Sequence, residues 1–319
     1  MSLLSDKKSL KTILHSKRAN IFYLEHCRVM QKDDRVLYLT QGKKEDSFWN
    51  IPIANTTVIL LGSGTSITQA AVRMLAAAGV LIGFCGGGGT PLFAGAEIEW
   101  LTPQSEYRPT EFLQGWMKFW FDEKKRLEVA KQFQLSRISF LRKVFSKDRE
   151  LIECNIDSRL PEFSDLLLNA EQKIMQAGEV ANLLQIEGQV TRQLYKNVSV
   201  ATGYGHFVRK SDKFDDANVF LNHGNYLAYG LAATTLWVLG IPHSFAVMHG
   251  KTRRGALVFD VADLIKDALV LPWAFVCAQR QYDDSAFRQQ CIDTFTRYKA
   301  MDFMFDQVKQ AAQKNDWLD

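Results

Sequence analysis

The segment LTPQSEYRPTEF, Leu101–Phe112, separates two halves of the chain that differ in pattern. It carries Pro103 and Pro109, which lack the backbone N–H that a helix or a sheet uses, and therefore favours a linker. Short β-type runs precede it, and helical periodicity dominates after it. We predict an α+β fold: a small β-rich domain over residues 1–105, made of hairpins and one or two helices, and a larger all-α domain over residues 106–319.

The β-type runs are separated by turn signals at Lys32–Asp34 and Gln41–Gly42, a pattern typical of hairpins. One helix is expected over Ile67–Ala78, after the hydroxyl-rich segment Gly62–Ser66. The predicted strands are NIFYLEH (20–26), RVMQ (28–31), RVLYLT (35–40), TTVILLG (56–62) and VLIGFC (80–85).

Two glycine-rich runs raise the question of nucleotide binding. Gly62 and Gly64 follow a strand and precede a helix, but Ile67 occupies the third glycine position of a dinucleotide-binding loop. The run Gly86–Gly89 is followed by Thr-Pro, not by the Gly-Lys-Ser/Thr of a phosphate-cradling loop. We therefore assign the first run to a turn and a helix cap.

Composition limits the function only weakly. The 319 residues are 47% apolar and 23% charged, with a formal net charge of +4 and a pI near 8.7, which fits a globular protein and permits nucleic-acid binding without requiring it. The five cysteines form no CxxC pair, which indicates reduced thiols, and no continuous apolar segment precedes the β half. We expect a soluble, cytoplasmic protein. The many basic residues of 106–150 are interpreted as a solvated helical face in preference to a dedicated DNA surface.

Glu187 is the first candidate for chemistry. In GEVANLLQIEGQVTRQLYKNV (178–198) it fills a position in the apolar stripe of a helix, so it should point inward. A carboxylate in that place needs a cation or hydrogen-bond donors. Gly188 beside it would allow a ligand or another backbone to approach. A salt bridge to a neighbouring helix is the alternative that the residues alone slightly favour.

Asp260, Asp263 and Asp267 form a second cluster in FDVADLIKDALVLP (259–272). Their spacing of i, i+3 and i+7 places three like charges on one helical face, which suggests a neutralising cation. The alternative is that Asp260 caps the helix N-terminus with Asp263 in its first turn. Asp267 is expected to be exposed to solvent.

His249 precedes a cationic loop that contains Lys251, Arg253 and Arg254. A histidine in such a place usually makes a structural hydrogen bond. Followed by an acidic helix, however, it also suits metal-assisted attack on a phosphodiester, with imidazole and carboxylates as ligands and the loop neutralising phosphates.

These motifs resemble the CRISPR-associated adaptation integrases, the Cas1 family. The likeness lies in LLQIEG (183–188), NYLAYG (225–230), AVMHGK (246–251) and FDVADLIK (259–266), in this order, and in the β-rich front and helical back of the whole chain. VLIGFCGGGGTPLF (80–93) and YRPTEF (107–112) are most similar to the I-F subtype. Many members have Glu at the position of Asp263, which leaves open whether Asp260 or Asp263 is the primary ligand; the family pattern favours Asp263, with Asp260 supporting it.

The resemblance implies a metal-dependent DNA endonuclease and integrase that inserts short foreign DNA into a CRISPR array. It implies Mg²⁺ or Mn²⁺ bound by Glu187, His249 and Asp263. The implied partners are incoming DNA, the CRISPR repeat, a second copy of the chain, and the Cas2 protein, which in the I-F subtype is fused to the Cas3 nuclease-helicase.

The remaining implied contacts concern DNA. Lys251, Arg253 and Arg254 would hold the DNA backbone, and Tyr229 would stack on or orient a strand end, although a tyrosine of the core is an equal alternative. The rival hypothesis is a non-catalytic DNA-binding scaffold with the same fold. A non-catalytic scaffold would have no use for Glu187, His249 and Asp263 together.

Overall fold

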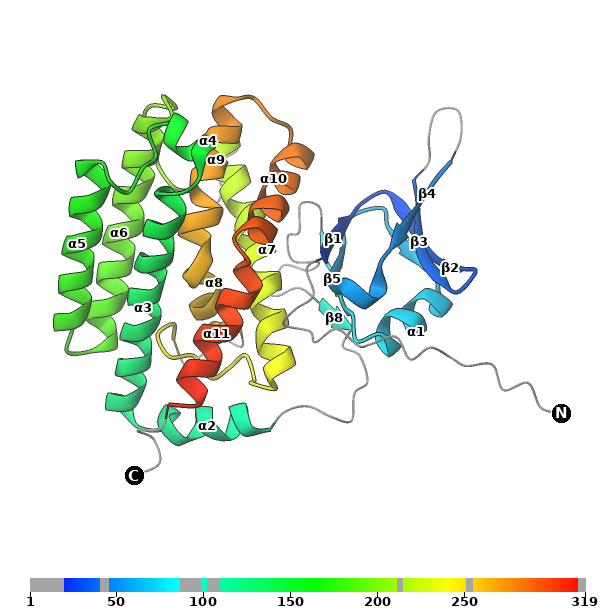
Figure 1. The fold of residues 1–319 in the computed structure, drawn as a ribbon, viewed down its shortest axis with the longest axis horizontal. Helices are drawn as coiled ribbons and strands as arrows, with labels where there is room; N and C mark the ends of the chain where they lie inside the picture. The colour runs from blue at the N-terminus through cyan, green and yellow to red at the C-terminus, as the bar shows by residue number, and fades with distance from the viewer. Residues whose placement is uncertain are drawn as a thin grey trace.

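The computed structural model describes residues 20–40, 46–86, 99–101, 110–210, 215–250 and 255–314. Strands occupy the first part of the chain and helices the second, so the α+β prediction is confirmed. In Figure 1 the strands lie to the right of a larger helical body. The predicted boundary between residues 105 and 106 lies outside the described residues.

The strands form two small sheets. In the first, the order is β1-β5-β7-β8, with the first three strands parallel and β8 antiparallel to β7. In the second, the order is β4-β3-β2-β6. The strands are β1 (Asn20–Leu24), β2 (Cys27–Lys32), β3 (Arg35–Thr40), β4 (Ser47–Ile51), β5 (Thr56–Leu61), β6 (Ser66–Ile67), β7 (Leu81–Phe84) and β8 (Glu99–Leu101), and a 3-10 turn, η2, covers Ile53–Asn55.

The hairpin prediction is confirmed in the second sheet, and the helix expected between the runs 56–62 and 80–85 is confirmed in the first. Strands β2, β3 and β4 form an antiparallel meander, and Asp33 and Asp34 both have positive φ, as the tight turn between β2 and β3 requires. In the first sheet, helix α1 (Gln69–Ala77) carries the chain from β5 to the parallel strand β7. It begins after Thr68, later than predicted, because β6 pairs with β2.

Strand β5 has the burial that is typical of a strand paired in parallel on both sides. All six of its residues are buried, so both faces of the strand are covered. Val58 and Leu60 belong to the core of the helical part, whereas Ile59 and Leu61 belong to a smaller core with the second sheet and α1. The first sheet therefore lies between two cores and joins the two parts of the molecule.

The first glycine run is a tight turn against β1. A Cβ atom on Gly62 would lie 2.5 Å from the Tyr23 Oη atom, and Gly64 has a φ of +68°. Close backbone approach and positive φ are the two conditions that select glycine. The turn interpretation is therefore confirmed, but the helix cap is wrong, because Thr68, after this run, caps α1.

Helices α2 to α11 make up the second part. They are α2 (Glu111–Trp120), α3 (Glu123–Phe145), α4 (Arg149–Glu153), α5 (Pro161–Gln176), α6 (Val180–Ala201), α7 (Asp216–Leu239), α8 (Ala256–Leu269), α9 (Leu271–Gln279), α10 (Asp284–Arg297) and α11 (Ala300–Ala312). Among the described residues, none of the helices combines the length and apolarity needed to cross a bilayer.

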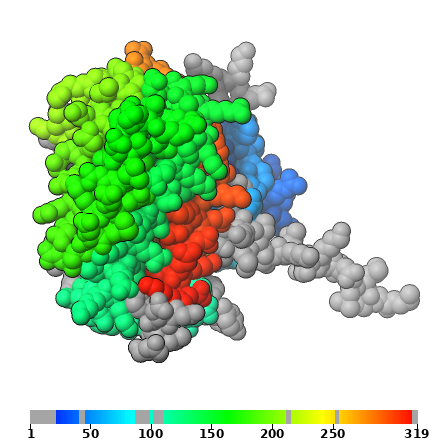
Figure 2. Space-filling model, turned by 60° about the vertical axis from the view of Figure 1, so that its left-hand side comes forward, coloured from blue at the N-terminus to red at the C-terminus, as the bar shows by residue number. Residues whose placement is uncertain are grey.

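Helix α3 packs against both α8 and α6, and α7 packs on the other side of α8. Figure 2 shows α11, in red, lying against the green helices, with the blue strands visible beyond it. The interpretation of 106–150 as a solvated basic face is wrong at two positions, because Arg126 and Arg137 of α3 are buried. The guanidinium groups of both residues donate hydrogen bonds inside the protein, and these bonds offset the loss of hydration.

Candidate metal centre

Three side chains that are far apart in the sequence meet between α6 and α8. Glu187 lies on α6, Asp263 on α8, and His249 in the loop that leads into α8. Their ligand atoms, one from each residue, all lie within 4.8 Å of one another. The prediction that Glu187 points inward is confirmed, because its side chain faces this cluster from the interior side of α6.

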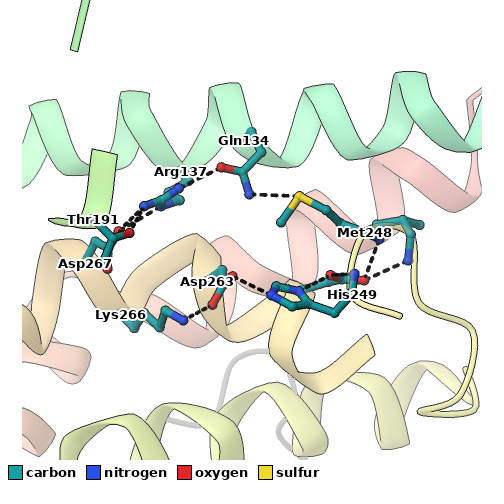
Figure 3. Close-up of polar contacts among 10 residues, drawn as sticks. Gln134, Arg137, Thr191, Met248, His249, Asp263, Lys266 and Asp267 are labelled. Atoms are coloured by element: carbon teal, nitrogen blue, oxygen red, sulfur yellow. Dashed lines mark hydrogen bonds and ion pairs between the residues drawn. The ribbon is translucent and has the colours of Figure 1, made fainter. Parts of the chain in front are cut away.

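Asp260 holds the histidine loop. Its carboxylate accepts hydrogen bonds from the backbone N–H groups of Val247 (2.7 Å), Met248 (3.1 Å) and His249 (3.0 Å), and it lies 2.7 Å from His249 Nδ1. Figure 3 shows these contacts beside His249. Because Asp260 is an acceptor, Nδ1 carries a proton, which leaves the Nε2 lone pair for a ligand.

The alternative of Asp260 as a helix cap is wrong. Helix α8 begins at Ala256, after Gly255 as N-cap, so Asp260 lies inside the helix. The sequence pattern could not show this, because the apolar residues Ala256–Phe259 before Asp260 fit either start of the helix.

Asp263 is the most buried of the three, at 1% exposure. Its Oδ1 atom pairs with the Lys266 ammonium, and His249 Nε2 lies 3.8 Å from Oδ2 (Figure 3). Among the described residues, neither carboxylate oxygen accepts a hydrogen bond of normal geometry. Lys266 supplies a cation to Oδ1, which leaves the buried Oδ2 as the oxygen that a further cation would satisfy.

Glu187, His249 and Asp263 therefore fit a divalent metal ion, because one imidazole and two carboxylates are ligands that Mg²⁺ and Mn²⁺ accept. The charges agree. Around the site, Glu187, Asp260, Asp263 and Asp267 face only two cations, Arg137 and Lys266, among the described residues. The formal charge with a neutral His249 is thus −2, which one divalent cation would neutralise.

Burial and neighbouring charges shift the ionisable groups. Burial, and then the Asp263 carboxylate, raises the pKa of Glu187. Burial acts to lower the pKa of Lys266, but the nearby Asp263, Tyr229 and Glu187 outweigh it and raise this pKa. The pKa of His249 is raised too, because the hydrogen bond to Asp260 and the charges of Asp263 and Glu187 exceed the effect of burial. The raised pKa values of Lys266 and His249 thus reflect a site rich in carboxylates, whereas burial is the larger cause for Glu187.

The expectation for Asp267 is wrong, because its side chain is only 3% exposed. It forms an ion pair with Arg137, at 2.9 Å from Nε to Oδ2. The helical spacing placed Asp267 on the acidic face correctly, but only the packing of α3 against that face supplies its partner. Arg137 and Lys266 are the residues at this site that the sequence patterns did not single out.

Of the four residues expected to contact DNA, the structure describes only Tyr229. Lys251, Arg253 and Arg254 lie outside the described residues. Tyr229 packs edge-on against Phe259, with ring centroids 4.9 Å apart, and burial raises its pKa. The contacts of Tyr229 fit the role of a core tyrosine beside the site, and its role toward DNA stays a prediction.

A cavity of about 650 Å³ opens along α6 beyond the cluster. Its walls combine the aromatic rings of Tyr195 and Phe207 with basic side chains, among them Arg192, Lys196 and Arg209. The spacing of Arg192 and Lys196 by one helical turn is the signal that could have placed them on one face.

Comparison with known proteins decides the family. Residues 22–301 match the model of the family described as CRISPR associated protein Cas1. The chain belongs to the Cas1 family. It is 54% identical over 312 residues to the CRISPR-associated endonuclease Cas1 of Pseudomonas aeruginosa strain UCBPP-PA14, covering 96% of each chain. It is 51% identical over 311 residues to the Cas1 endonuclease of Pectobacterium atrosepticum, covering 96% of this chain and 95% of the relative.

Solved structures agree with the Cas1 fold. The TtCas1–DNA complex superposes with a TM-score of 0.66 at 22% identity, covering 92% of both chains. A casposase bound to an integration product gives a TM-score of 0.68 at 12% identity, covering 93% of this chain and 92% of that one. The Cas6-RT-Cas1–Cas2 complex gives 0.63 at 15% identity, covering 92% of this chain and 34% of that one.

Proposed function

We propose that this Cas1 protein is a divalent-metal-dependent DNA endonuclease and integrase that inserts short foreign DNA into a CRISPR array in the bacterial cytoplasm. The observation that carries the proposal is the convergence of Glu187, His249 and Asp263, with their ligand atoms within 4.8 Å of one another. The names of the P. aeruginosa and P. atrosepticum relatives support endonuclease activity, and the casposase neighbour supports integration.

In the proposed reaction a 3′-hydroxyl of the incoming DNA attacks a phosphodiester of the repeat. A new P–O bond forms to the incoming 3′ oxygen, which loses its proton, as the bond to the 3′ oxygen of the repeat strand breaks and that oxygen takes up a proton, so one phosphodiester and one hydroxyl replace another pair. When bound, Mg²⁺ or Mn²⁺ supplies charge stabilisation to the phosphoryl oxygens. Glu187, His249 and Asp263 would hold it.

The other side chains prepare the site. Asp260 keeps the proton on His249 Nδ1 and the imidazole in one orientation. Lys266 balances the Asp263 carboxylate. Lys251, Arg253 and Arg254 are proposed to hold the DNA backbone, and Tyr229 to orient a strand end.

The cavity along α6 is proposed to take a single-stranded DNA end. Its two rings can stack on bases, and its cations can neutralise phosphates. The TtCas1–DNA complex supports DNA as a partner, and the Cas1–Cas2 complex supports Cas2. We extend the proposal to a homodimer and to a Cas2 partner fused to Cas3.

The deciding experiment uses purified protein, branched DNA and Mn²⁺. The unmodified protein should nick the branch, and Glu187→Ala, His249→Ala and Asp263→Ala should each abolish nicking. Asp306→Ala, which removes an exposed carboxylate of α11, is the control and should nick normally. Nicking in EDTA, or full activity of His249→Ala, would overturn the proposed site.

The same assay separates an enzyme from a scaffold. A non-catalytic scaffold would bind branched DNA equally well in EDTA and would leave it intact in Mn²⁺. Binding of DNA without metal-dependent nicking would therefore favour the scaffold.

A further inference from the structure

One turn of α3 contacts every element that carries a residue of the metal centre. The Arg137 guanidinium donates from Nε to Asp267 Oδ2 (2.9 Å) and from Nη2 to both Asp267 and Thr191 Oγ1, the latter at 2.7 Å. Its Nη1 donates to Gln134 Oε1 at 2.7 Å. Figure 3 shows Arg137 and Gln134 projecting from α3 toward this group. A single planar guanidinium therefore fixes residues of α3, α6 and α8.

The partners of Arg137 on α6 and α8 each lie one helical turn from a proposed ligand. Thr191 follows Glu187 by four residues on α6, and Asp267 follows Asp263 by four residues on α8. Residues four apart lie on the same helical face, about one turn from each other. Thr191 also donates to Asp267 Oδ2 at 3.2 Å. The spacing of α6 and α8 is thus set one turn away from the ligand atoms.

The third ligand is connected through Gln134. The Gln134 amide lies 3.5 Å from the sulfur of Met248, and the backbone N–H of Met248 donates to Asp260. Met248 directly precedes His249. The α3 turn therefore contacts the histidine loop as well as the two helices.

We propose that Arg137 is a positioning residue that sets the separation of Glu187 and Asp263 and so determines the affinity of the site for a divalent metal. This inference rests on the proposed function of that site. Charge alone predicts the opposite, because Arg137 is a cation beside the carboxylates and repels a second cation. The contacts that Arg137 makes with both α6 and α8 explain why a buried cation lies beside this anionic site.

Mn²⁺ alone is the probe, titrated into the protein by calorimetry, with circular dichroism to confirm folding. Removing a group that orients metal ligands typically weakens metal binding about 10–100-fold, and we expect Arg137→Met to fall in that range. Arg137→Lys keeps the charge but loses the planar fork, so we expect it to weaken binding as well.

Arg288→Met is the matched control. Arg288 is also a buried arginine, and it pairs with Asp284 and Glu25 instead of the metal centre. It should lose comparable stability while its Kd for Mn²⁺ stays within about twofold, because no ligand orientation changes. A role of Arg137 in stability alone would make the two variants behave alike.

Thr191→Val decides the matter if Arg137→Met does not fold. It removes one hydroxyl at nearly constant volume, and we expect binding about tenfold weaker, at the lower end of the range for such groups. Unchanged or tighter Mn²⁺ binding in the folded variants would overturn the positioning role. If Glu187→Ala binds Mn²⁺ as well as the unmodified protein, the proposed metal centre itself fails, which is a different result.

Discussion

Replacing Asp260 with asparagine exchanges one of two buried oxygens for an amide nitrogen. Oδ2 accepts from the backbone N–H groups of Val247 and Met248, and Oδ1 accepts from His249. The side-chain amide of asparagine can keep its oxygen toward only one of these groups. If the oxygen stays toward His249, its NH₂ group faces two other donors.

The loss can be worked out from these contacts. A hydrogen bond to a charged acceptor contributes about 1.5–3 kcal/mol, so two lost bonds destabilise the fold by at least about 3 kcal/mol. For a unit of the size of the helical part, this corresponds to a fall in Tm of about 6–12 °C. The loop then holds His249 less firmly, and metal-dependent nicking should fall about 10–100-fold.

The assay combines thermal unfolding with nicking of branched DNA in Mn²⁺, and Asp306→Asn is the control. An unchanged Tm together with unchanged nicking would refute the idea that Asp260 holds the histidine loop. Loss of nicking at an unchanged Tm would also refute it, because that result makes Asp260 a metal ligand and not a support of the loop.

Three further outcomes are expected. Gly188→Ala should raise stability by about 0.5–1 kcal/mol, because a Cβ there meets nothing within 4 Å; weaker DNA binding in the same variant would reveal a ligand passing that helix. Alanine at both Arg192 and Lys196 should weaken DNA binding and reduce the slope of log K against log salt by about 1.5, whereas an unchanged slope means that the cavity contacts no phosphate. Burial opposes ionisation of Asp284, but the hydrogen bond to His223 outweighs it and lowers the pKa of Asp284. The resulting stabilisation is present above the unfolded-state pKa and is lost as pH falls through the folded one, so Asp284→Asn should lower Tm at neutral pH and lose this effect in acid.

Local patterns were sufficient for much of the fold. The helical stripe placed Glu187 inward, and the turn signal between β2 and β3 predicted their hairpin. These features depend on neighbours along the chain. The parallel pairing of β1, β5 and β7 does not depend on such neighbours, because β2 to β4 lie between β1 and β5 in the chain, and β6 and α1 lie between β5 and β7. The sequence pattern of each strand fits either orientation.

The candidate site likewise has features that the sequence indicated and features that only the tertiary structure decided. The sequence supplied the candidates, since the motifs that resemble the Cas1 family include Glu187, His249 and Asp263 as expected ligands. Tertiary structure alone decided the roles of their neighbours. Asp260 became a support of the histidine loop because α8 begins at Ala256, and Asp267 became buried because Arg137 of α3 packs against it. A buried charge needs a partner, and that partner lies 130 residues away in the sequence, where no local pattern can identify it.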